Sequence, residues 1–417
     1  MDMVSPEEAR RIILDSVSVL PVESVSIIDA AGRVCAQDLC SDIDVSPFAH
    51  SAMDGFALYC EDIANACEDN PIELTVIEEV PAGSHYDGQV KHGECVRIMT
   101  GAPIPAGVNA VVKYEIVGIV SGDGKKGSVV SFSEPIKEMS NIRAAGEEAK
   151  AGEVAVHAGE TLSTAGIGFI AGCGILEVPV YARPKVGIIA IGSELVNPDE
   201  MPTPGCIRNS NSYALAACAH AAGALPTILP IVVDDEDLLA DAVLKATDEF
   251  DFIVTSGGAS NGDFDFIKPV VERLGELRMT SVNMRPGKAQ TFGIVNNTPV
   301  FGLPGNPAAA YLGFEMLIRP ALRKMQGAHT FEHPVIKARL TQDKKKKDPR
   351  RFYMRAVLHR AEDGQIDVTP VKNQSSGLFG PIHKTNCLAI FPEDTTFIPQ
   401  GDLIDCILLD VNEDVAL

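Results

Sequence analysis

Between Arg183 and Gly327, short apolar runs alternate with helical patterns, and this alternation constrains the fold more than any other feature of the chain. Each run has the length of a strand and leads into a segment of helix length, as KVGIIAIGS does before SYALAACAHAAG and LPTILPIVV before EDLLADAVLKATDEF. Strands and helices that alternate in this way build a mainly parallel sheet with helices on both faces. We therefore predict a central, doubly wound, mainly parallel α/β domain over residues 181–328.

The sequence on either side of this domain has a different pattern. A chain of 417 residues is too long for one core, so several domains are expected. Short β-rich runs separated by Gly, Pro and Asn predict an inserted β-rich domain, and β-like runs near the end predict a C-terminal β domain. The predicted architecture is thus multidomain α/β plus β, with an N-terminal and linking domain at 1–45 and 142–180, the inserted domain at 46–141 and the C-terminal domain at 329–417.

The net charge of −22, from 57 acidic and 35 basic residues, argues against two classes of partner. A field of this sign repels nucleic acid and anionic membranes.

The segment from Asn209 to Val233 has no Asp, Glu, Lys or Arg, but Gly223 and two prolines interrupt it. We interpret it as a buried helix followed by a buried strand and not as a membrane span. The ten cysteines include no CxxC pair, and SPEEARR begins a helix instead of a signal peptide, which together favour a cytoplasmic location.

Two loops that follow predicted strands carry chemistry. In a doubly wound sheet the ligand lies at the carboxyl ends of the strands, where IGSEL and TSGGASNGDFDF fall. Gly257 and Gly258 let the backbone approach a ligand closely, and the helix that begins beyond Gly262 favours an anion. Asp263 and Asp265 supply the hard oxygen ligands that Mg²⁺ prefers. The alternative is a helix start with ordinary capping acids, because Asp is favoured there in any case.

Two further loops favour the ligand interpretation. NMRPGKAQ places Arg285 and Lys288 in a Pro-Gly turn, where two cations stand out in an acidic chain. Such a pair binds phosphate or another oxyanion, and Arg can do so bidentately. In GLPGNPAAA, Pro304 and Pro307 flank Asn306 and hold the loop rigid, as a binding wall requires. The central domain is therefore predicted to hold an anionic, phosphorylated ligand together with a divalent metal.

Other signals are interpreted as structural. GIGFIA, residues 166–171, fits the loose dinucleotide fingerprint, but it lies inside a predicted helix with no strand before it. The run from Lys344 to Lys347 is expected to be a solvated loop. His50 and His220 are isolated in the sequence, so they predict no metal site.

Taken together, the motifs resemble those of the molybdopterin molybdenumtransferase family, the molybdenum insertases of the MoeA and gephyrin type. SAMDGFA, VRIMTGAPIPAGVNAVV and NIRAAGEE are similar to the first half of the family's sequences. IGSEL, NSNSYAL, SGGASNGDFDF, MRPGKA and GLPGNP are similar to the central domain, and RRFYMR and NQSSG to the C-terminal domain. The resemblance covers essentially the whole chain, and such a series in this order is highly specific.

The resemblance implies a reaction in which adenylylated molybdopterin and molybdate yield molybdenum cofactor and AMP, with Mg²⁺ assisting. It also implies a homodimer, in which the inserted β domain of one subunit partly closes the cleft of the other. Transient contact with a molybdopterin adenylyltransferase or a molybdoenzyme chaperone is compatible with it.

The resemblance also implies the residues of the site. The catalytic residues are Glu194, Asp263, Asp265, Lys288 and Asp54, and the metal ligands are Glu194, Asp263 and Asp265. The substrate-binding residues are Thr100, Ser210, Asn211, Ser256, Gly257, Gly258, Ser260, Arg285, Pro304, Asn306 and Pro307, with Arg351 or Arg355 and Ser375 or Ser376 reaching the molybdate from the last domain.

The chemistry of these residues agrees with the implied reaction. Molybdate is a tetrahedral dianion, which suits Arg, Lys, Ser hydroxyls and backbone amides. Mg²⁺ would bridge carboxylates and the pyrophosphate and neutralise charge as the bond to AMP breaks. The protein need supply no covalent nucleophile, because positioning suffices in phosphoryl chemistry.

The sequence departs from the family pattern at a few positions and leaves alternatives open. Glu148 stands where an Asp is usual, and Ala309 stands where a Ser is common. The residues do not distinguish molybdate from tungstate as the oxyanion. Two other functions compete with the insertase: a molybdopterin adenylyltransferase, against which the flanking domains argue, and an inactive scaffold that binds molybdopterin or a partner protein.

Overall fold

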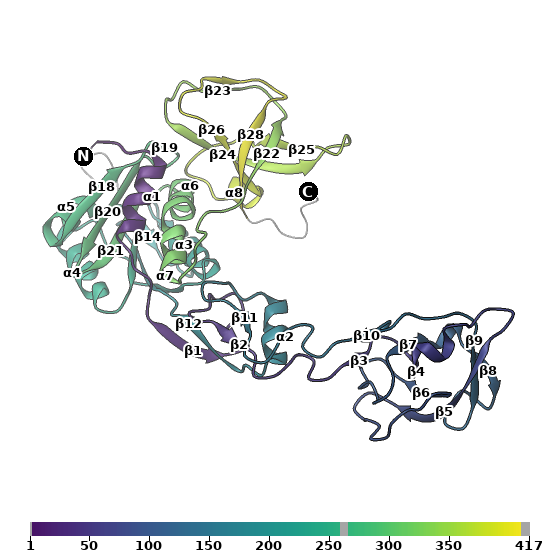
Figure 1. The fold of residues 1–417 in the computed structure, drawn as a ribbon. Coiled ribbons are helices and arrows are strands. Elements are labelled where there is room, and N and C mark those ends of the chain that lie inside the picture. The colour runs from purple at the N-terminus through teal and green to yellow at the C-terminus, as the bar shows by residue number, and fades with distance from the viewer. Residues whose placement is uncertain (1, 259–265, 410–417) are drawn as a thin grey trace. The chain divides into compact units, whose positions relative to one another are not determined.

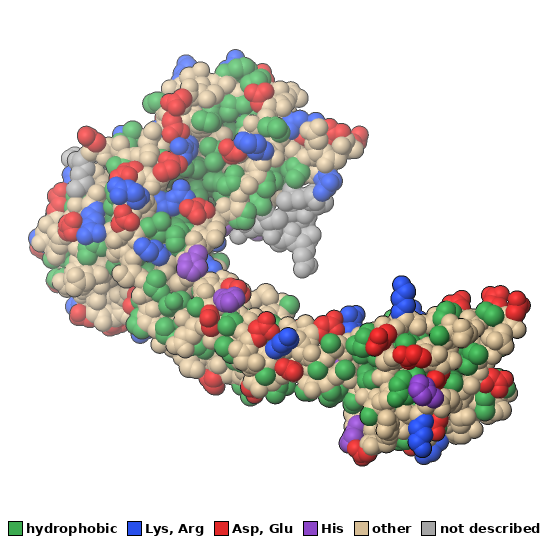
Figure 2. All heavy atoms as spheres, viewed as in Figure 1, with side chains coloured by type: hydrophobic (Ala, Val, Ile, Leu, Met, Phe, Trp, Pro, Cys, Tyr) green, Lys and Arg blue, Asp and Glu red, His purple; other side chains and the backbone are tan. Residues whose placement is uncertain are grey.

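The computed structural model describes residues 2–258 and 266–409 and divides the chain into two compact units. The first unit comprises residues 1–23, 32–36 and 179–417, and the second comprises residues 24–31 and 37–178. On the face that Figure 2 shows, acidic and basic side chains are interspersed over both units. In the described part of the chain, no helix is both long enough and apolar enough to cross a membrane.

A six-stranded mixed sheet forms the centre of the first unit (Figure 1). Its strands, in spatial order, are β16 (Leu225–Ile228), β13 (Lys185–Ala190), β17 (Phe252–Ser256), β21 (Thr298–Leu303), β20 (Ala289–Val295) and β18 (Glu276–Ser281). The first four are mutually parallel, and β20 and β18 add antiparallel pairs at one edge. The predicted mainly parallel sheet is confirmed.

Both faces of this sheet are buried, because successive strand residues enter two different cores. Ile188 packs in one core and its neighbour Ile189 packs in the other. The first core includes residues of α1 (Pro6–Asp15), α3 (Asn211–Ala221), α6 (Pro307–Gly313), η3 (Phe314–Ile318) and α7 (Arg319–Met325). The second core includes residues of α4 (Glu236–Thr247) and α5 (Ile267–Leu274). Helices on both faces define the doubly wound arrangement that the sequence predicts.

Two local expectations for this domain were wrong. The strand predicted within LPTILPIVV is β16, but it is largely exposed, because it lies at the edge of the sheet and pairs only with β13. The predicted single long helix after Asn306 is interrupted by the π-helical turn η3, which ends just before Pro320. Proline has no N–H to continue the regular bonding pattern, so the helix widens by one residue at this point.

The C-terminal part of the first unit is a closed β-barrel. Each strand in the ring pairs with the next, in the order β24 (Arg351–Arg360), β25 (Ile366–Pro370), β22 (Val335–Leu340), β28 (Leu403–Leu408) and β26 (Cys387–Phe391), and β26 pairs back to β24. The short strand β19 (Met284–Arg285) from the central domain adds to β24 in parallel. The remaining elements here are the pair β23 (Lys344–Lys345) with β27 (Phe397–Ile398), and α8 (Gly380–His383).

The second unit is β-rich, as the sequence predicts. Its main sheet has the order β7 (Ala110–Lys113), β4 (Gly55–Leu58), β6 (Glu94–Ile98), β5 (Ile72–Val80), β9 (Val129–Phe132) and β8 (Gly118–Ser121). The smaller elements are β2 (Leu39–Cys40), β3 (His50–Ser51), η1 (Cys60–Ile63), η2 (Tyr114–Ile116), β10 (Ile142–Arg143), β11 (Val154–Val156) and α2 (Thr164–Gly172). Strands β1 (Val22–Ser26) and β12 (Glu177–Tyr181) lie where the chain passes between the units. GIGFIA falls inside α2, which confirms its predicted helical position.

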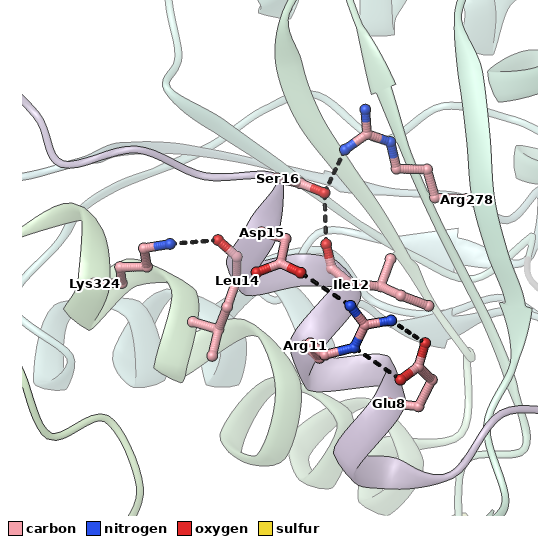
Figure 3. A network of polar contacts seen from close by, with 8 residues as sticks. All are labelled: Glu8, Arg11, Ile12, Leu14, Asp15, Ser16, Arg278 and Lys324. Atoms are coloured by element: carbon pink, nitrogen blue, oxygen red, sulfur yellow. Dashed lines mark hydrogen bonds and ion pairs between the residues drawn. The ribbon is translucent and has the colours of Figure 1, made fainter.

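The N-terminal helix α1 is fastened to the central domain at its carboxyl end (Figure 3). Ser5 caps its start by accepting a hydrogen bond from the Glu8 N–H. At the other end, Lys324 of α7 donates from Nζ to the Leu14 carbonyl at 2.7 Å. Ser16 Oγ donates to the Ile12 carbonyl and accepts from Arg278 of β18. A lysine cation and a serine hydroxyl, itself bonded by Arg278, thus donate to carbonyl groups of the last turn of the helix.

Replacing Lys324 with Met should lower the free energy of unfolding of the first unit by about 1–2 kcal/mol, because a partly buried carbonyl loses a charged donor. Arg11→Met is the matched control, since Arg11 pairs with Glu8 and Asp15 only on the exposed face of α1. Scanning calorimetry of the full chain measures both midpoints. An Arg11 variant that shifts the midpoint as far as the Lys324 variant does would contradict this account.

Candidate functional site

The larger of two adjoining pockets in the first unit lies at the carboxyl ends of the parallel strands and has a volume of about 820 Å³. Its walls come from the loops after β13, β17 and β21 and from the segment before α3, the place where a doubly wound sheet binds its ligand. Of the residues named from the sequence, it brings together Glu194, Ser210, Asn211, Ser256, Gly257, Gly258, Pro304, Asn306 and Pro307.

Glycines let the strand-end loops approach one another in this pocket. Gly257 has a φ of +91°, and a Cβ at this position would lie 2.1 Å from the Ile191 carbonyl oxygen. No other residue fits there without displacing backbone. The Gly257 N–H donates to the Leu303 carbonyl at 3.1 Å, so the loop after β17 is bound directly to the end of β21.

Asn211 connects three walls of the larger pocket. Its Nδ2 donates to Ser256 Oγ at 2.8 Å and to the Gly305 carbonyl at 2.9 Å. Its Oδ1 is buried and has no protein donor among the described residues. A buried acceptor without a donor costs free energy, so Asn211 Oδ1 is suited to accept a hydrogen bond from a bound ligand.

The carboxylates of the larger pocket are Glu194 and Asp234. Ser193 fixes Asp234 in place, because the Ser193 N–H donates to Asp234 Oδ2 at 2.9 Å and Ser193 Oγ accepts from the Asp234 N–H at 3.1 Å. The predicted residues Ser260, Asp263 and Asp265 lie outside the described residues. Within residues 2–258 and 266–409, no group of three His, Cys, Asp or Glu side chains forms a metal cluster.

The smaller pocket, of about 520 Å³, is cationic and shares Pro304 and Asn306 with the larger one. The central domain contributes Arg285 and Lys288, and the C-terminal domain contributes Arg350, Gln374, Ser375 and Ser376. Two contacts hold the domains together here. Strand β19 pairs with β24, Arg285 lying opposite Phe352, and the Ala308 N–H at the start of α6 donates to the Ser376 carbonyl at 2.8 Å.

Asp348 orients the arginines of the smaller pocket. Arg350 Nε lies 2.9 and 3.1 Å from the two Asp348 oxygens, and Arg350 Nη2 also donates to Oδ2. Arg285 Nη1 lies 3.9 Å from the same carboxylate, and its guanidinium stacks on the Phe352 ring at 4.5 Å. The hydrogen bond from Arg350 holds the pKa of Asp348 down to about 2. The carboxylate therefore stays ionised and fixes both cations at neutral pH.

The expectation of a solvated lysine loop was wrong for Lys346, which is buried. Its Nζ donates to the Arg350 carbonyl at 2.6 Å and lies over the Phe391 ring. Burial lowers the pKa of the Lys346 ammonium, and backbone oxygens and an aromatic face replace water around it. Lys346 thus supports the backbone that carries Arg350.

Arg351 and Arg355, the two arginines named from the sequence, lie outside the wall of the smaller pocket. Arg351 donates to both oxygens of Glu393 at 2.9 Å and also pairs with Glu7 of α1. Arg355 is completely buried behind the pocket, where its Nη2 donates to the Ser375 carbonyl at 3.2 Å. The cation that β24 places beside the pocket is instead Arg350, the residue just before the strand begins.

In the second unit, Asp54 and Thr100 form one polar cluster on the surface. Thr100 donates to Asp54 Oδ1 from both its N–H and its Oγ1, each at 2.7 Å. These two hydrogen bonds, the backbone one first, lower the pKa of Asp54. The structure therefore brings together the two residues that the sequence names in the inserted domain.

Three family models together match most of the chain. They are described as the MoeA N-terminal region (domain I and II) at residues 4–174, a probable molybdopterin binding domain at 187–324, and the MoeA C-terminal region (domain IV) at 337–409. A molybdopterin molybdenumtransferase of Bacillus subtilis is 36% identical over 93% of this chain and 90% of its own length. The chain belongs to the MoeA family of molybdopterin molybdenumtransferases. Members of this family are transferases of molybdenum cofactor biosynthesis.

A second relative and a solved structure are similar over nearly their full length. A molybdopterin molybdenumtransferase of Staphylococcus epidermidis is 32% identical over 98% of this chain and 96% of its own. The crystal structure of the molybdopterin biosynthesis moeA protein from Pyrococcus horikoshii superposes with a TM-score of 0.83 at 30% identity, covering 98% of this chain and 100% of that one. The fold is therefore that of a MoeA protein from end to end.

Sequence reasoning missed several residues that line the pockets of this MoeA protein, among them Asp234 and Arg208 in the larger pocket and Arg350 and Gln374 in the smaller one. Asp234 directly follows the apolar run LPTILPIVV, so its position after a predicted strand was the available signal. Arg350 is the first residue of RRFYMR, but the sequence alone does not say which of two adjacent arginines faces the pocket. The departure at Ala309 from the usual Ser falls on the wall of the smaller pocket.

Asp348→Asn should destabilise the protein at neutral pH but much less in acid. The folded-state pKa of about 2 lies below the ordinary value of 3.8, so the ionised carboxylate stabilises the fold above about pH 4 and this contribution is lost as the pH falls toward 2. We expect a difference in unfolding free energy of about 1–2 kcal/mol between wild type and variant at pH 6, shrinking below pH 4. Urea titrations across this range measure it. Glu362→Gln is the control, because Glu362 is exposed and has no ion pair in the described residues, and its free energy of unfolding should change little at any pH. A destabilisation by Asp348→Asn that grew in acid would refute the assignment.

Proposed function

We propose that the two adjoining pockets bind the two substrates of one transfer, an adenylylated molybdopterin in the larger and molybdate in the smaller. The observation that carries this proposal is the shared wall of Pro304 and Asn306 between a polar, glycine-lined pocket and a cationic one. Substrates bound in two pockets that share lining residues lie close together, which favours reaction between them. The products are then molybdenum cofactor and AMP.

The larger pocket suits a pterin nucleotide in size and chemistry. Its volume of about 820 Å³ lies within the range of pockets that enclose such ligands. Gly257 and Gly258 allow close approach of the backbone to phosphate, and Asn211 Oδ1 accepts a ring N–H or hydroxyl. Ser256 and Ser210 add hydroxyl groups along the same wall.

The smaller pocket suits a tetrahedral dianion. Arg285, Lys288 and Arg350 concentrate positive charge in a chain with a net charge of −22. Ser375 and Ser376 add hydroxyl donors. Groups held in place before the oxyanion arrives stabilise developing charge without reorganising, which is the main way such a site accelerates transfer.

We propose that Mg²⁺ binds where the pyrophosphate lies, with Glu194 and Asp234 as oxygen ligands together with Asp263 and Asp265. The donor set fits, because carboxylate oxygens at the rim of a phosphate pocket are the ligands that Mg²⁺ prefers. When bound, the ion would neutralise charge on the pyrophosphate oxygens. The protein's own part is to hold these carboxylates in place, as Ser193 holds Asp234.

Asp265→Asn should lower Mg²⁺-dependent turnover by about tenfold or more while leaving thermal unfolding unchanged, because a ligand charge is lost without a change of size. A titration of turnover against Mg²⁺ measures the effect. Asp248→Asn, at the exposed carboxyl end of α4 and outside the lining of both pockets, is the control. Unchanged turnover in the Asp265 variant would remove this residue from the metal site.

We propose further that the active form is a cytoplasmic homodimer, in which Asp54 and Thr100 of one copy complete the site of the other. The polar Asp54–Thr100 cluster has the chemistry of a binding surface, with an exposed carboxylate fixed by two hydrogen bonds. The mass of the full chain in solution tests the dimer. Transient contact with an adenylyltransferase or a molybdoenzyme chaperone would serve the delivery of a labile substrate and product.

The function itself is tested by incubating the full chain with adenylylated molybdopterin and Mg²⁺, with and without molybdate, and measuring AMP. AMP release that depends on molybdate, with formation of molybdenum cofactor, is the expected result. Synthesis of the adenylylated pterin from ATP would favour an adenylyltransferase instead. Binding of the pterin with no release of AMP would favour a scaffold.

In the same assay, Arg350→Met should lower kcat/KM for molybdate by about tenfold or more, because it removes a cation from the pocket wall. Arg351→Met removes a cation that pairs with Glu393 and Glu7 elsewhere, so its main effect should be on stability. Steady-state kinetics against molybdate, combined with thermal unfolding, separates the two. A larger rise of KM in the Arg351 variant would reverse the assignment.

A further inference from the structure

The larger pocket has one basic side chain in its described lining, that of Arg208. The same lining carries the carboxylates of Glu194 and Asp234, so this single cation stands against two negative charges. Carboxylates repel a ligand that carries phosphate, and such a ligand needs a positive group to contact. Arg208 is therefore the side chain of this described lining that can bind a phosphate oxygen through a full charge.

Backbone pairing fixes Arg208 at the pocket wall. It lies on β15 (Ile207–Arg208), a short strand that pairs in parallel with β14 (Leu195–Val196). The N–H of Ile207 donates to the carbonyl of Glu194 at 2.8 Å. The arginine is thus bound through its own strand to the segment that carries a carboxylate of the pocket.

The loop that joins β14 to β15 supports this position. Three of its residues are prolines, which fix φ: Pro198, Pro202 and Pro204. Further along the loop, the Cys206 N–H closes a turn onto the Thr203 carbonyl at 2.9 Å. A loop with few accessible conformations loses little entropy when a ligand binds beside it.

The Arg208 guanidinium uses one nitrogen within the protein. Its Nε donates to the Glu200 carbonyl at 3.1 Å, while Nη1 and Nη2 make no hydrogen bond or ion pair with the described residues. Glu200 is itself held, because its carboxylate accepts from the Asn197 N–H at 3.0 Å. Arg208 is exposed, and its two Nη groups match two oxygens of one phosphate.

Helix α3, which begins at Asn211 shortly after Arg208, adds positive potential to the same wall. Ser210 at its N-cap makes no side-chain cap hydrogen bond, and both Ser210 and Asn211 line the pocket. The N–H of Ser212 is capped instead, by Asn209 Oδ1 at 3.2 Å. The positive end of the helix thus lies beside the pocket, next to the charge of Arg208.

We infer that Arg208 and the first turn of α3 form the phosphate subsite of the larger pocket, and that Arg208 makes this pocket prefer a phosphorylated ligand to the same ligand without its phosphate. This inference rests on the proposed function of the larger pocket and adds the residue that recognises the nucleotide by its charge. Without Arg208 the described lining would present carboxylates and no basic side chain, which disfavours phosphate.

A comparison of AMP with adenosine isolates this role, because the two ligands differ only in the phosphate. Arg208→Gln removes the charge but keeps an N–H donor for the Glu200 carbonyl. We expect this variant to weaken AMP binding by about tenfold and adenosine binding by less than about twofold. Arg208→Lys keeps the charge without the planar fork and should bind AMP within about threefold of wild type.

Isothermal titration calorimetry of the full chain, at a constant concentration of Mg²⁺, measures both dissociation constants. Arg360→Gln is the matched control, because it removes the same charge from an exposed arginine outside both pockets, and it should leave both constants unchanged. If adenosine binds too weakly to titrate, the salt dependence of the AMP dissociation constant replaces it. This dependence should be flatter in Arg208→Gln than in wild type, because one ion contact is lost.

Equal weakening of AMP and adenosine by Arg208→Gln, or an unchanged salt dependence, would indicate a merely structural role and overturn the inference. Wild-type affinity for AMP in the same variant would overturn it as well. Each of these results leaves the proposed function standing, since wild type binds AMP in all of them. If the wild-type protein does not bind AMP, the larger pocket fails as a nucleotide site and the role of Arg208 fails with it.

Discussion

The parallel pairing of β19 with β24 is the contact on which the site depends, since it joins the basic turn of the central domain to the C-terminal barrel. The pairing sets the two residues of β19, from the central domain, in register with β24 of the barrel, so that Arg285 lies opposite Phe352. Without this pairing, Arg285 and Lys288 would form half of a pocket, and Arg350 and the two serines the other half. The closed barrel matters because a ring of strands has no free edge and gives β24 a fixed position. The site is thus built by backbone hydrogen bonds before any side chain contributes.

Electrostatics explain why an acidic protein can bind an oxyanion. The positive charge is concentrated in the smaller pocket. One carboxylate, Asp348, contacts both Arg350 and Arg285, and its single negative charge does not neutralise the two cations. Lys346 is a buried cation whose Nζ donates to the carbonyls of Arg350 and Glu393. It supports the backbone at Arg350 without adding a negative charge to the pocket. In the larger pocket the close contact depends on glycine. Because Gly257 has no side chain, the loop after β17 can pack directly against the Ile191 backbone in the loop after β13. The smaller pocket therefore presents three cations, Arg285, Lys288 and Arg350, whereas the larger pocket combines a glycine-lined backbone with the carboxylates of Glu194 and Asp234.

Much of this could be predicted from the sequence, and what could not has identifiable physical reasons. Alternation of apolar runs and helices specifies the doubly wound sheet, because both faces must be covered, and the strand-end loops then specify the larger pocket. The sequence names Arg351 and Arg355, whereas the structure places Arg350 at the wall of the smaller pocket. The sequence alone does not show this, because tertiary contacts orient the two neighbouring side chains, Arg350 with Asp348 and Arg351 with Glu393. Burial of Lys346 depends on a β23–β27 pairing between segments some fifty residues apart, which local composition does not encode. The roles of Asp263 and Asp265 stay predictions.

The loop of Pro304 to Pro307 has a consequence that follows from thermodynamics alone. Pro304 and Asn306 line both pockets, so the two proposed ligands would contact the same loop. Any change that one ligand makes in this loop alters the affinity of the other, and linkage requires the factor to be equal in both directions. A pterin nucleotide that prepares the loop for the oxyanion is in turn retained more tightly once the oxyanion is bound. Under the proposed function, a loop that lines both pockets through Pro304 and Asn306 would thus keep a labile intermediate on the protein until both reactants are present.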